Sequence, residues 1–437
     1  MGLDYKKTFY IGLGFFTTGI TWSLFNAYVP IFLSYFGIPF ILIGFIMTLD
    51  NISAITLQPF IGARSDKTWS DRFGRRIPYL LIGIPLAAFF FTLIPIFTHS
   101  DIINFENLRR IFGFGPEDIV LDRTFIGFVF FSIWIICFNI AMALYRAPTV
   151  ALMPDIIENE YRGRANGIIN LMGGIGTVFA FAVGSILYDM NWVLPFLATS
   201  GLMIAALIIL VIKIKEPKVP MGTVNEEEKV NIIEGFKEVF RSRDDKSILF
   251  ILLAIFFWFF GYNVVETWFT IYGKQILNIS ESAAAFSLNL VAIPFILMAI
   301  PAGIIAERIS RKKTIMIGLL MIIICISLVS LLSLIVNPQN TLSVILICFP
   351  IVGIGWSLVN INSITMVWEI GKGEKQGAYT GIYYFFSQAA AIIGPPIIGL
   401  FFDIFGTPLP LFPLSTIFFV LAFMAMFFVK SGEYQKE

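Results

Sequence analysis

The sequence predicts an all-α membrane protein with twelve transmembrane helices, arranged as two six-helix halves related by a pseudo-two-fold axis. Three observations predict this fold: the composition, the number of long apolar runs and a repeat of charged loops. The 437 residues are 57% hydrophobic and only 14% charged, with a mean hydropathy of +0.85. An ordinary soluble domain is ~25% charged. The chain therefore has too few polar residues to cover a soluble globule.

Twelve apolar runs are each long enough to cross a bilayer as a helix. We place them at residues 9–35, 40–62, 77–97, 124–150, 165–187, 192–214, 248–273, 283–305, 314–336, 342–367, 378–402 and 410–430. The first run follows Met1 to Lys7 without a small-residue cleavage site, so we expect it to be a retained span and not a signal peptide.

Lysine and arginine set the orientation, because cytoplasmic loops carry an excess of both. With the N-terminus in the cytoplasm, 25 of these residues fall in inside segments and 4 in outside loops. The sequence therefore predicts a multi-pass protein of the cell (inner) membrane with both termini cytoplasmic.

The chain divides into an N-terminal half (residues 1–214), a cytoplasmic linker (215–247) and a C-terminal half (248–437). Apolar residues in the linker recur at helical spacing among charges, which predicts an amphipathic helix on the membrane surface. Residues 155–168 align without a gap on 369–382, and residues 71–76 align on 307–312. Two repeated loops at equivalent places predict parallel halves related by an axis along the membrane normal.

Acids and arginines gather at the cytoplasmic ends of the spans. Charge-assisted bonds among them can close the cytoplasmic side of a transporter. The alternative is a purely topological role, but lysines would serve that role and the fixed order of acid and arginine favours a gate. We include Arg146, inside the fourth span, as a snorkelling or gate-pairing arginine. The predicted cytoplasmic gate is Asp66, Arg72, Arg75, Arg76, Arg146, Asp155, Glu307, Arg308, Arg311 and Glu369.

Two carboxylates lie inside spans, where ionisable groups are costly and usually face a cavity. Asp50 is about ten residues into the second span, and Glu266 lies near the middle of the seventh. A carboxylate that changes protonation as the cavity alternates can couple transport to protons. Asp50 and Glu266 are therefore the proton-coupling candidates, with a structural carboxylate as the alternative for each.

Several spans place an aromatic residue and an amide one helical turn apart, hence on one face. Sugar sites use such pairs, because the ring covers the apolar face of a pyranose and the amide bonds its hydroxyls. The alternative is that these polar groups join helices to one another. The substrate-binding candidates are Trp22, Asn26, Asn51, Asn139, Asn263, Trp356, Asn360, Tyr384 and Gln388.

The loop from Gly62 to Asp66 and then from Asp71 to Arg76 resembles the G-x-x-x-D-R-x-G-R-R/K signature of the major facilitator superfamily. Its five-residue insert and its ending at Pro78 are similar to the sucrose/proton symporter family, with glycoside–pentoside–hexuronide cation symporters as near relatives. The block containing Pro148 and Pro154-Asp155 adds to the resemblance.

The resemblance implies that spans 1, 4, 7 and 10 line a cavity. Plant members carry an arginine where this chain has Val150, and the cation symporters carry an acid where it has Gln58.

We expect a secondary active transporter that imports a disaccharide or glucoside with a proton by alternating access. The alternatives are sodium-coupled glycoside uptake, sugar or drug efflux, and a non-transporting membrane sensor or scaffold. We expect no enzyme activity, no cofactor, no metal site and no nucleic-acid partner, since the net charge is +1 and the only histidine is His99. Cys137, Cys325 and Cys348 are interpreted as packing residues. The expected partners are a sugar and the lipid bilayer, and we expect a monomer.

Overall fold

A computed structural model describes residues 3–96, 123–218, 246–335, 338–370 and 376–430. Within those ranges the regular structure is helical, apart from one isolated bridge between Ser70 and Gly74. The chain forms two compact units, residues 1–224 and 225–437. Most of the predicted linker, and with it the predicted amphipathic helix, lies outside the described residues.

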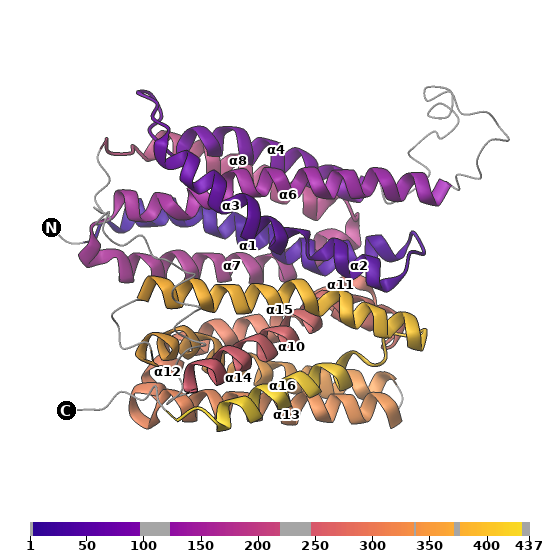
Figure 1. The fold of residues 1–437 in the computed structure, drawn as a ribbon. Helices are drawn as coiled ribbons and strands as arrows, with labels where there is room; N and C mark the ends of the chain where they lie inside the picture. Colours follow the sequence, from indigo (N-terminus) through magenta and orange to yellow (C-terminus); the bar gives the residue numbers. More distant parts are fainter. Residues whose placement is uncertain (1–2, 97–122, 219–245, 336–337, 371–375, 431–437) are drawn as a thin grey trace. The chain divides into compact units, whose positions relative to one another are not determined.

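The first unit contains six membrane-length segments, and the long helices lie side by side (Figure 1). Its second segment is two helices separated by one residue, Thr48, whose hydroxyl donates to Phe45 O over 2.8 Å. The helices are α1 (Tyr5–Ser34), α2 (Phe40–Met47), α3 (Leu49–Lys67), α4 (Ile77–Ile96), α6 (Arg123–Ile156), α7 (Arg162–Met190) and α8 (Leu194–Lys213), with a short 3-10 helix, η1 (Asn159–Tyr161), before α7.

The second unit repeats this organisation. Its second segment is again two helices, divided at Leu288. The helices are α10 (Ser247–Gln275), α11 (Glu281–Ser287), α12 (Asn289–Ile309), α13 (Arg311–Ile335), α14 (Pro338–Ile370), α15 (Gln376–Phe405) and α16 (Leu411–Phe427).

All twelve predicted spans coincide with these segments, so the predicted fold class is confirmed. Among the described residues, ten segments are both long and apolar enough to cross a membrane. The other two are α1, whose 30 residues include many threonines and Asn26, and α16, which has 17 residues. The fourth predicted span was too short, because α6 continues beyond residue 150 to Ile156.

The same helix pairs pack together in both units. In the first unit α1 packs on α7 and α8, and α6 packs on α3 and α4. In the second unit α10 packs on α15 and α16, and α14 packs on α12 and α13. The repeat also holds at one backbone position, since Gly74 and its aligned partner Ser310 both have positive φ, 87° and 109°. The repeat predicted from the charged loops is therefore visible in the packing.

Backbones touch where small residues face each other. A Cβ on Gly19 of α1 would lie 2.2 Å from Gly173 O of α7. A Cβ on Gly318 of α13 would lie 2.5 Å from Gly355 O of α14. Small residues allow this approach in membrane helices, where packing and not the hydrophobic effect holds helices together.

Candidate functional site

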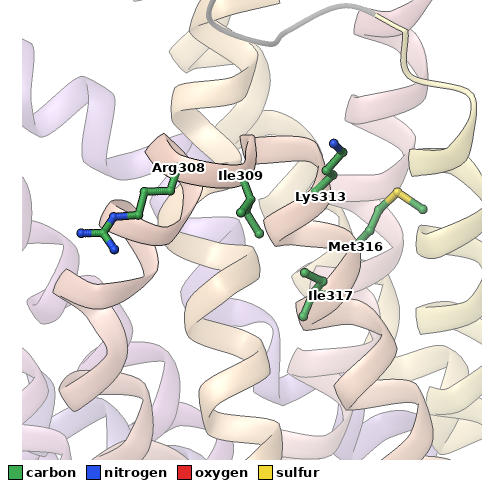
Figure 2. A pocket seen from close by; sticks show the side chains of 5 residues that line it. All are labelled: Arg308, Ile309, Lys313, Met316 and Ile317. Atoms are coloured by element: carbon green, nitrogen blue, oxygen red, sulfur yellow. The ribbon is translucent and has the colours of Figure 1, made fainter.

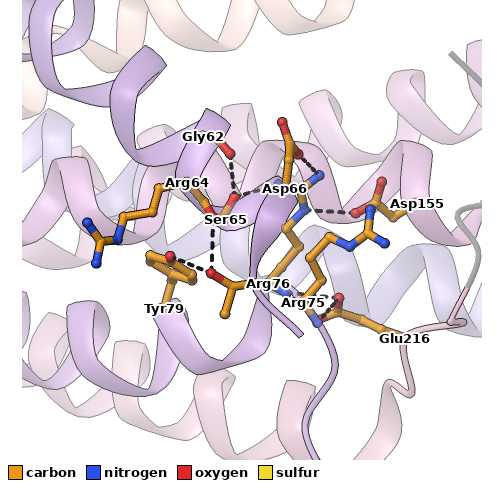
Figure 3. Close-up of polar contacts among 10 residues, drawn as sticks. Gly62, Arg64, Ser65, Asp66, Arg75, Arg76, Tyr79, Asp155 and Glu216 are labelled. Atoms are coloured by element: carbon orange, nitrogen blue, oxygen red, sulfur yellow. Dashed lines mark hydrogen bonds and ion pairs between the residues drawn. The ribbon is translucent and has the colours of Figure 1, made fainter. Parts of the chain in front are cut away.

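The clearest polar cluster lies where α3 ends and α4 begins (Figure 3). Arg76 is 4% exposed and binds two carboxylates. Its Nε donates to Asp155 Oδ2 over 2.8 Å, and its Nη2 lies 2.5 Å from Asp66 Oδ1. Its Nη1 donates to the hydroxyl of Ser65. One planar guanidinium thus joins the end of α3, the start of α4 and the end of α6, which a lysine could not do with the same geometry.

Burial disfavours the charged form of Arg76, whereas its carboxylate partners favour that form. Desolvation lowers the pKa of Arg76, whereas the hydrogen bonds and charges of Asp155 and Asp66 raise it, and the net pKa lies above the ordinary value. The arginine therefore stays charged. The two partners differ in exposure, because the Asp155 side chain is 14% exposed and that of Asp66 is 57% exposed. Asp155 is the partner with less solvent screening.

A further carboxylate caps α4 from the segment after α8. Both oxygens of Glu216 accept backbone hydrogen bonds, from Arg75 N over 2.7 Å, Arg76 N over 2.9 Å and Ile77 N over 2.8 Å. These N–H groups have no partner within the helix, and the positive end of the helix dipole favours an anion there. Glu216 therefore fixes the start of the linker to the loop that carries Arg76. A hollow of about 440 Å³ beside it is lined in part by Asp71, Arg72 and Glu216.

The second unit has a counterpart of this ion pair. Arg311 Nε donates to Glu369 Oε1 over 2.7 Å, which joins the start of α13 to the end of α14. Both side chains are 21% exposed, so this pair is less buried than Arg76 with Asp155. Lys312 donates to Val429 O after α16, so each unit also ties this loop to the end of its sixth segment. Each unit therefore brings predicted gate residues together. These are Arg76, Asp66 and Asp155 in the first unit, and Arg311 and Glu369 in the second.

The other predicted gate residues make weaker contacts. Arg72 lies over the Phe73 ring, 5.0 Å from its centroid, and Arg75 contributes its backbone N–H to Glu216. Among the described residues Glu307 and Arg308 make no ion pair. Arg308 lines an open hollow of about 680 Å³ at the α12–α13 turn, and its guanidinium points away from the other four side chains (Figure 2). This hollow contains none of the substrate-binding candidates.

Arg146 lies elsewhere than the gate assignment implies. It is nine residues before Asp155 on α6, about 14 Å along the axis at the helical rise. Its Cζ lies 5.5 Å from the centroid of the Trp22 ring, in the middle of α1. Within its own unit, the structure thus places Arg146 beside a substrate-binding candidate and away from the Arg76 cluster.

Trp22 also belongs to an aromatic cluster of the first unit. Its ring meets Phe25 and Phe138 at centroid distances of 5.5 and 5.9 Å. Asn139, the next residue on α6, is 3% exposed and donates from Nδ2 to Ile135 O. Within the described part of the chain, Asn139 Oδ1 and Trp22 Nε1 are buried without a hydrogen-bond partner. Unpaired buried groups of this kind need an explanation, and a ligand is one.

The second unit holds an aromatic pair beside a carboxylate. The ring of Tyr262 stacks on Trp356 with centroids 4.1 Å apart and planes 4° apart. Phe259 meets the edge of the same indole at 5.4 Å. Glu266 follows Tyr262 by one helical turn on α10, so both side chains project from the same face of the helix. The predicted candidates Glu266 and Trp356 are therefore close to a common residue, Tyr262, that sequence reasoning missed although its spacing from Glu266 is helical.

Asp50 lies at the second residue of α3, directly after the break at Thr48. This is about ten residues into the second predicted span, which the structure keeps as one membrane-length segment, Phe40–Lys67, with Thr48 between its two helices. Asn51 Nδ2 donates to Asp50 Oδ1 over 2.7 Å. Asn51 is thus a partner of the coupling candidate, a contact that its assignment to the substrate did not anticipate. Acids are favoured in the first turn of a helix, where free N–H groups point toward them.

The remaining substrate-binding candidates are spread over four helices. Gln388 Oε1 is buried without a partner among the described residues. Asn263 donates to Phe259 O over 2.7 Å. Tyr384 is 53% exposed, whereas its neighbour Tyr383 is buried and hydrogen-bonded to Ser363. Asn26 and Asn360 are half-buried. Within the described ranges, no three His, Cys, Asp or Glu side chains are grouped closely enough to hold a metal ion.

Comparison with known proteins identifies the family. The family model described as Major Facilitator Superfamily matches residues 11–395 and, in a second match, 274–437. Sucrose transport protein SUC4 of Arabidopsis thaliana is 28% identical over 167 residues, 38% of this chain and 30% of that protein. Multidrug resistance protein 1 of Bacillus subtilis is 24% identical over 365 residues, 83% of this chain and 81% of that protein. The match to the plant sucrose carrier therefore spans less than a third of that relative.

Solved structures share the fold. A nucleoside transporter, NupG, has a TM-score of 0.70 at 12% identity, covering 97% of this chain and 100% of that one. A D-xylose-proton symporter has a TM-score of 0.65 at 16% identity, covering 97% of this chain and 98% of that one. At these identities the likeness shows the fold alone.

Proposed function

Because the chain belongs to the Major Facilitator Superfamily, we propose that it is a secondary active transporter that imports a disaccharide or other glucoside together with a proton. It works by alternating access in a cell membrane, with the substrate bound inside the helical bundle. It needs no cofactor beyond the coupling ion.

The stacking of Tyr262 on Trp356, with Glu266 one helical turn from Tyr262, is the observation that carries the sugar assignment. A pyranose offers an apolar face and a rim of hydroxyls, so it needs a flat ring surface and polar acceptors close together. A carboxylate accepts from hydroxyls and makes stronger bonds than a neutral acceptor. Helix α10 supplies Tyr262 and Glu266 one turn apart, and α14 supplies Trp356.

Asp50 is the proposed proton carrier. It stands at the break between α2 and α3, on the same segment that ends at Asp66 in the Arg76 cluster. Sixteen residues of helix, about 24 Å, separate the two acids. Protonation of Asp50 can therefore alter the conformation of this segment. The other end of the segment is joined to α4 and α6 by the ion pairs of Arg76. The ion pairs of Arg76 and Arg311 act as latches that stabilise one conformation.

The names of the relatives support a sugar as the transported substrate but leave drug efflux as an alternative. Sucrose transport proteins and a human proton-associated sugar transporter share 24–28% identity over about two fifths of the chain. Drug efflux is the second candidate, because the similarity to multidrug resistance protein 1 extends over 83% of the chain. A drug site would favour apolar lining, whereas Glu266 and Gln388 of the second unit supply hydrogen-bonding groups suited to hydroxyls.

Exchange in proteoliposomes tests the substrate class. Purified protein is reconstituted with unlabelled sucrose, maltose or trehalose inside, and entry of the same labelled sugar is followed without any ion gradient. We expect at least one of these sugars to exchange, and Trp356→Ala to reduce the exchange about tenfold or more, since aromatic anchors dominate binding. Exchange of a lipophilic cation but of no sugar would favour the efflux assignment instead.

A further inference from the structure

We propose that the hollow at the α12–α13 turn binds an anionic phospholipid, with Arg308 and Lys313 on its phosphate and the apolar faces of the two helices against its acyl chains. The site belongs to the second unit alone. It is independent of the substrate that the protein transports, so it goes beyond the proposed function. It rests on the predicted orientation, in which this turn faces the cytoplasm.

Four basic residues lie in and around the α12–α13 turn, and two of them already have partners in the second unit. Arg311 pairs with Glu369 over 2.7 Å. Lys312 donates to backbone carbonyls at the end of α16. Arg308 and Lys313 are both exposed and make no ion pair with a described acid of their own unit. These two are the basic residues that line the hollow.

The lining of the hollow combines these cations with apolar side chains. Its volume is about 680 Å³, and its other lining residues are Ile309, Met316 and Ile317. Figure 2 shows Ile309 between the basic side chains of Arg308 and Lys313. All five lining residues are thus basic or apolar, and none would repel an anion. A fitting ligand carries a negative charge directly beside an apolar part.

An exposed apolar stripe runs along each helix from the hollow into the membrane span. On α13 the exposed residues after Lys313 are Ile317, Leu320, Ile324, Leu328 and Leu331. On α12 the exposed residues that lead up to Arg308 are Ile293, Leu297, Ile300 and Ile304. Spacings of three and four place each set on one helix face. Each stripe therefore ends in one of the two cations at the hollow.

This arrangement matches the chemistry of an anionic phospholipid. Guanidinium and ammonium groups make charge-assisted hydrogen bonds to phosphate oxygens. Basic pockets between transmembrane helices on the cytoplasmic side bind lipid head groups, and the cytoplasmic leaflet is the one that carries anionic lipids. A purely topological role would explain the cations but not the apolar lining between them. A soluble phosphate compound would use the cations and leave both stripes uncovered.

The first unit offers a matched comparison. Its hollow of about 440 Å³ is also lined by two cations, Arg72 and Lys215, but Asp71 and Glu216 line it as well. The acids offset the cations, so this hollow lacks the excess positive charge of the one in the second unit. We therefore expect the preference for an anionic lipid at the α12–α13 turn and not here.

Native mass spectrometry of the purified full-length protein in detergent tests the proposal. The protein is titrated with phosphatidylglycerol or with phosphatidylcholine of the same acyl chains, and the first binding step is compared. We expect phosphatidylglycerol to bind about tenfold or more tightly, because two cations act on a lipid with net negative charge. The double variant Arg308→Gln/Lys313→Gln should reduce this ratio to about twofold or less. Ile317→Trp, which fills the hollow and retains both charges, should weaken binding of phosphatidylglycerol about threefold or more.

The matched control is Arg72→Gln/Lys215→Gln, which removes the same charge from the other hollow and should keep the ratio. Thermal unfolding of each variant without lipid establishes that it is folded before titration. Equal affinity for the two lipids, or an unchanged ratio in Arg308→Gln/Lys313→Gln, would overturn the proposal. An equal loss in the control would attribute the preference to overall surface charge and would also overturn it. Displacement of the lipid by glycerol phosphate at equal concentration would show that the acyl chains add nothing, which contradicts a lipid site.

Discussion

Arg76 and Asp155 fasten the start of α4 to the end of α6 through a hydrogen bond of 2.8 Å between Nε and Oδ2. The aligned Asp155 and Glu369 occupy the same place in the two units, but their arginines do not. Arg76 aligns with Lys312, whereas the arginine that binds Glu369 is Arg311, one position earlier. The shift accompanies the shorter turn of the second unit, where only Ser310 separates α12 from α13. The ion pair is thus repeated in both units, although the arginine that makes it lies one sequence position earlier in the second unit.

The two acids on Arg76 should contribute unequally to stability. Asp155→Asn removes the less exposed partner and should cost about 2–3 kcal/mol, because a buried guanidinium loses a charged acceptor. Asp66→Asn removes the exposed partner and should cost about 0–1 kcal/mol. Thermal unfolding of each variant in detergent measures the difference. Equal losses for both, or a larger loss for Asp66→Asn, would contradict the assignment of Asp155 as the principal partner.

The loop before α4 should require glycine at position 74. Gly74 has φ 87°, and a Cβ there would lie 2.6 Å from Glu216 Cβ. Gly74→Ala should therefore destabilise the protein by about 1–3 kcal/mol through backbone strain and displacement of the Glu216 cap. Ser310→Gly is the matched control, because φ there is 109° and glycine relieves the strain. It should unfold at the same temperature as the wild type or higher, and a loss comparable to that of Gly74→Ala would count against this explanation.

The stabilisation from Arg76 should not depend on pH in the ordinary range. Desolvation lowers its pKa, but Asp155 and Asp66 raise it to a net value above the ordinary one. A cation whose folded-state pKa is raised contributes stability in full below the unfolded value, and loses it only as pH rises through the higher folded value. The difference in unfolding temperature between wild type and Arg76→Met should thus be constant from about pH 7 to about pH 10. A difference that decreases within this range would show that Arg76 titrates.

Cys325 and Cys348 should be close enough to cross-link. Gly318 of α13 touches Gly355 of α14, and moving seven residues along both antiparallel helices leads to Cys325 opposite Cys348. Both residues are buried between the two helices. Oxidation by diamide, a membrane-permeant two-electron oxidant, should remove two of three maleimide-reactive thiols and leave Cys137. Cys325→Ser should keep both of its thiols, and three reactive thiols in the oxidised wild type would contradict this packing.

The sequence could predict the fold because each span is a continuous apolar run and the charged loops repeat. Hydropathy could not reveal the interruption at Thr48, since Met47, Thr48 and Leu49 lie within an unbroken apolar pattern. It also could not distinguish Arg146 from the gate arginines. In the sequence, Arg146 and Arg76 each lie near the cytoplasmic end of a predicted span. Only the packing of α1 on α6 shows that Arg146 lies beside Trp22.

The sequence indicated which residue types could form the candidate site, but not which of these residues contact one another. Trp356 and Glu266 are separated by 90 positions in the sequence, and Tyr262 connects them only because α10 and α14 pack together. Glu216 had a local signal, a Glu-Pro pair directly after the sixth span. Its role as the cap of α4 depends on a contact across about 140 residues, which no local pattern records.

We propose that proton movement through Asp50 drives sugar accumulation. The direct measurement is uptake of a labelled sugar that passes the exchange test into proteoliposomes with an alkaline interior, compared with a sodium gradient at equal pH. We predict accumulation above the external concentration with the pH gradient alone. Asp50→Asn should abolish that accumulation but retain exchange, because the neutral amide cannot release a proton. Accumulation that needs sodium and ignores the pH gradient, or that persists in Asp50→Asn, would contradict the account.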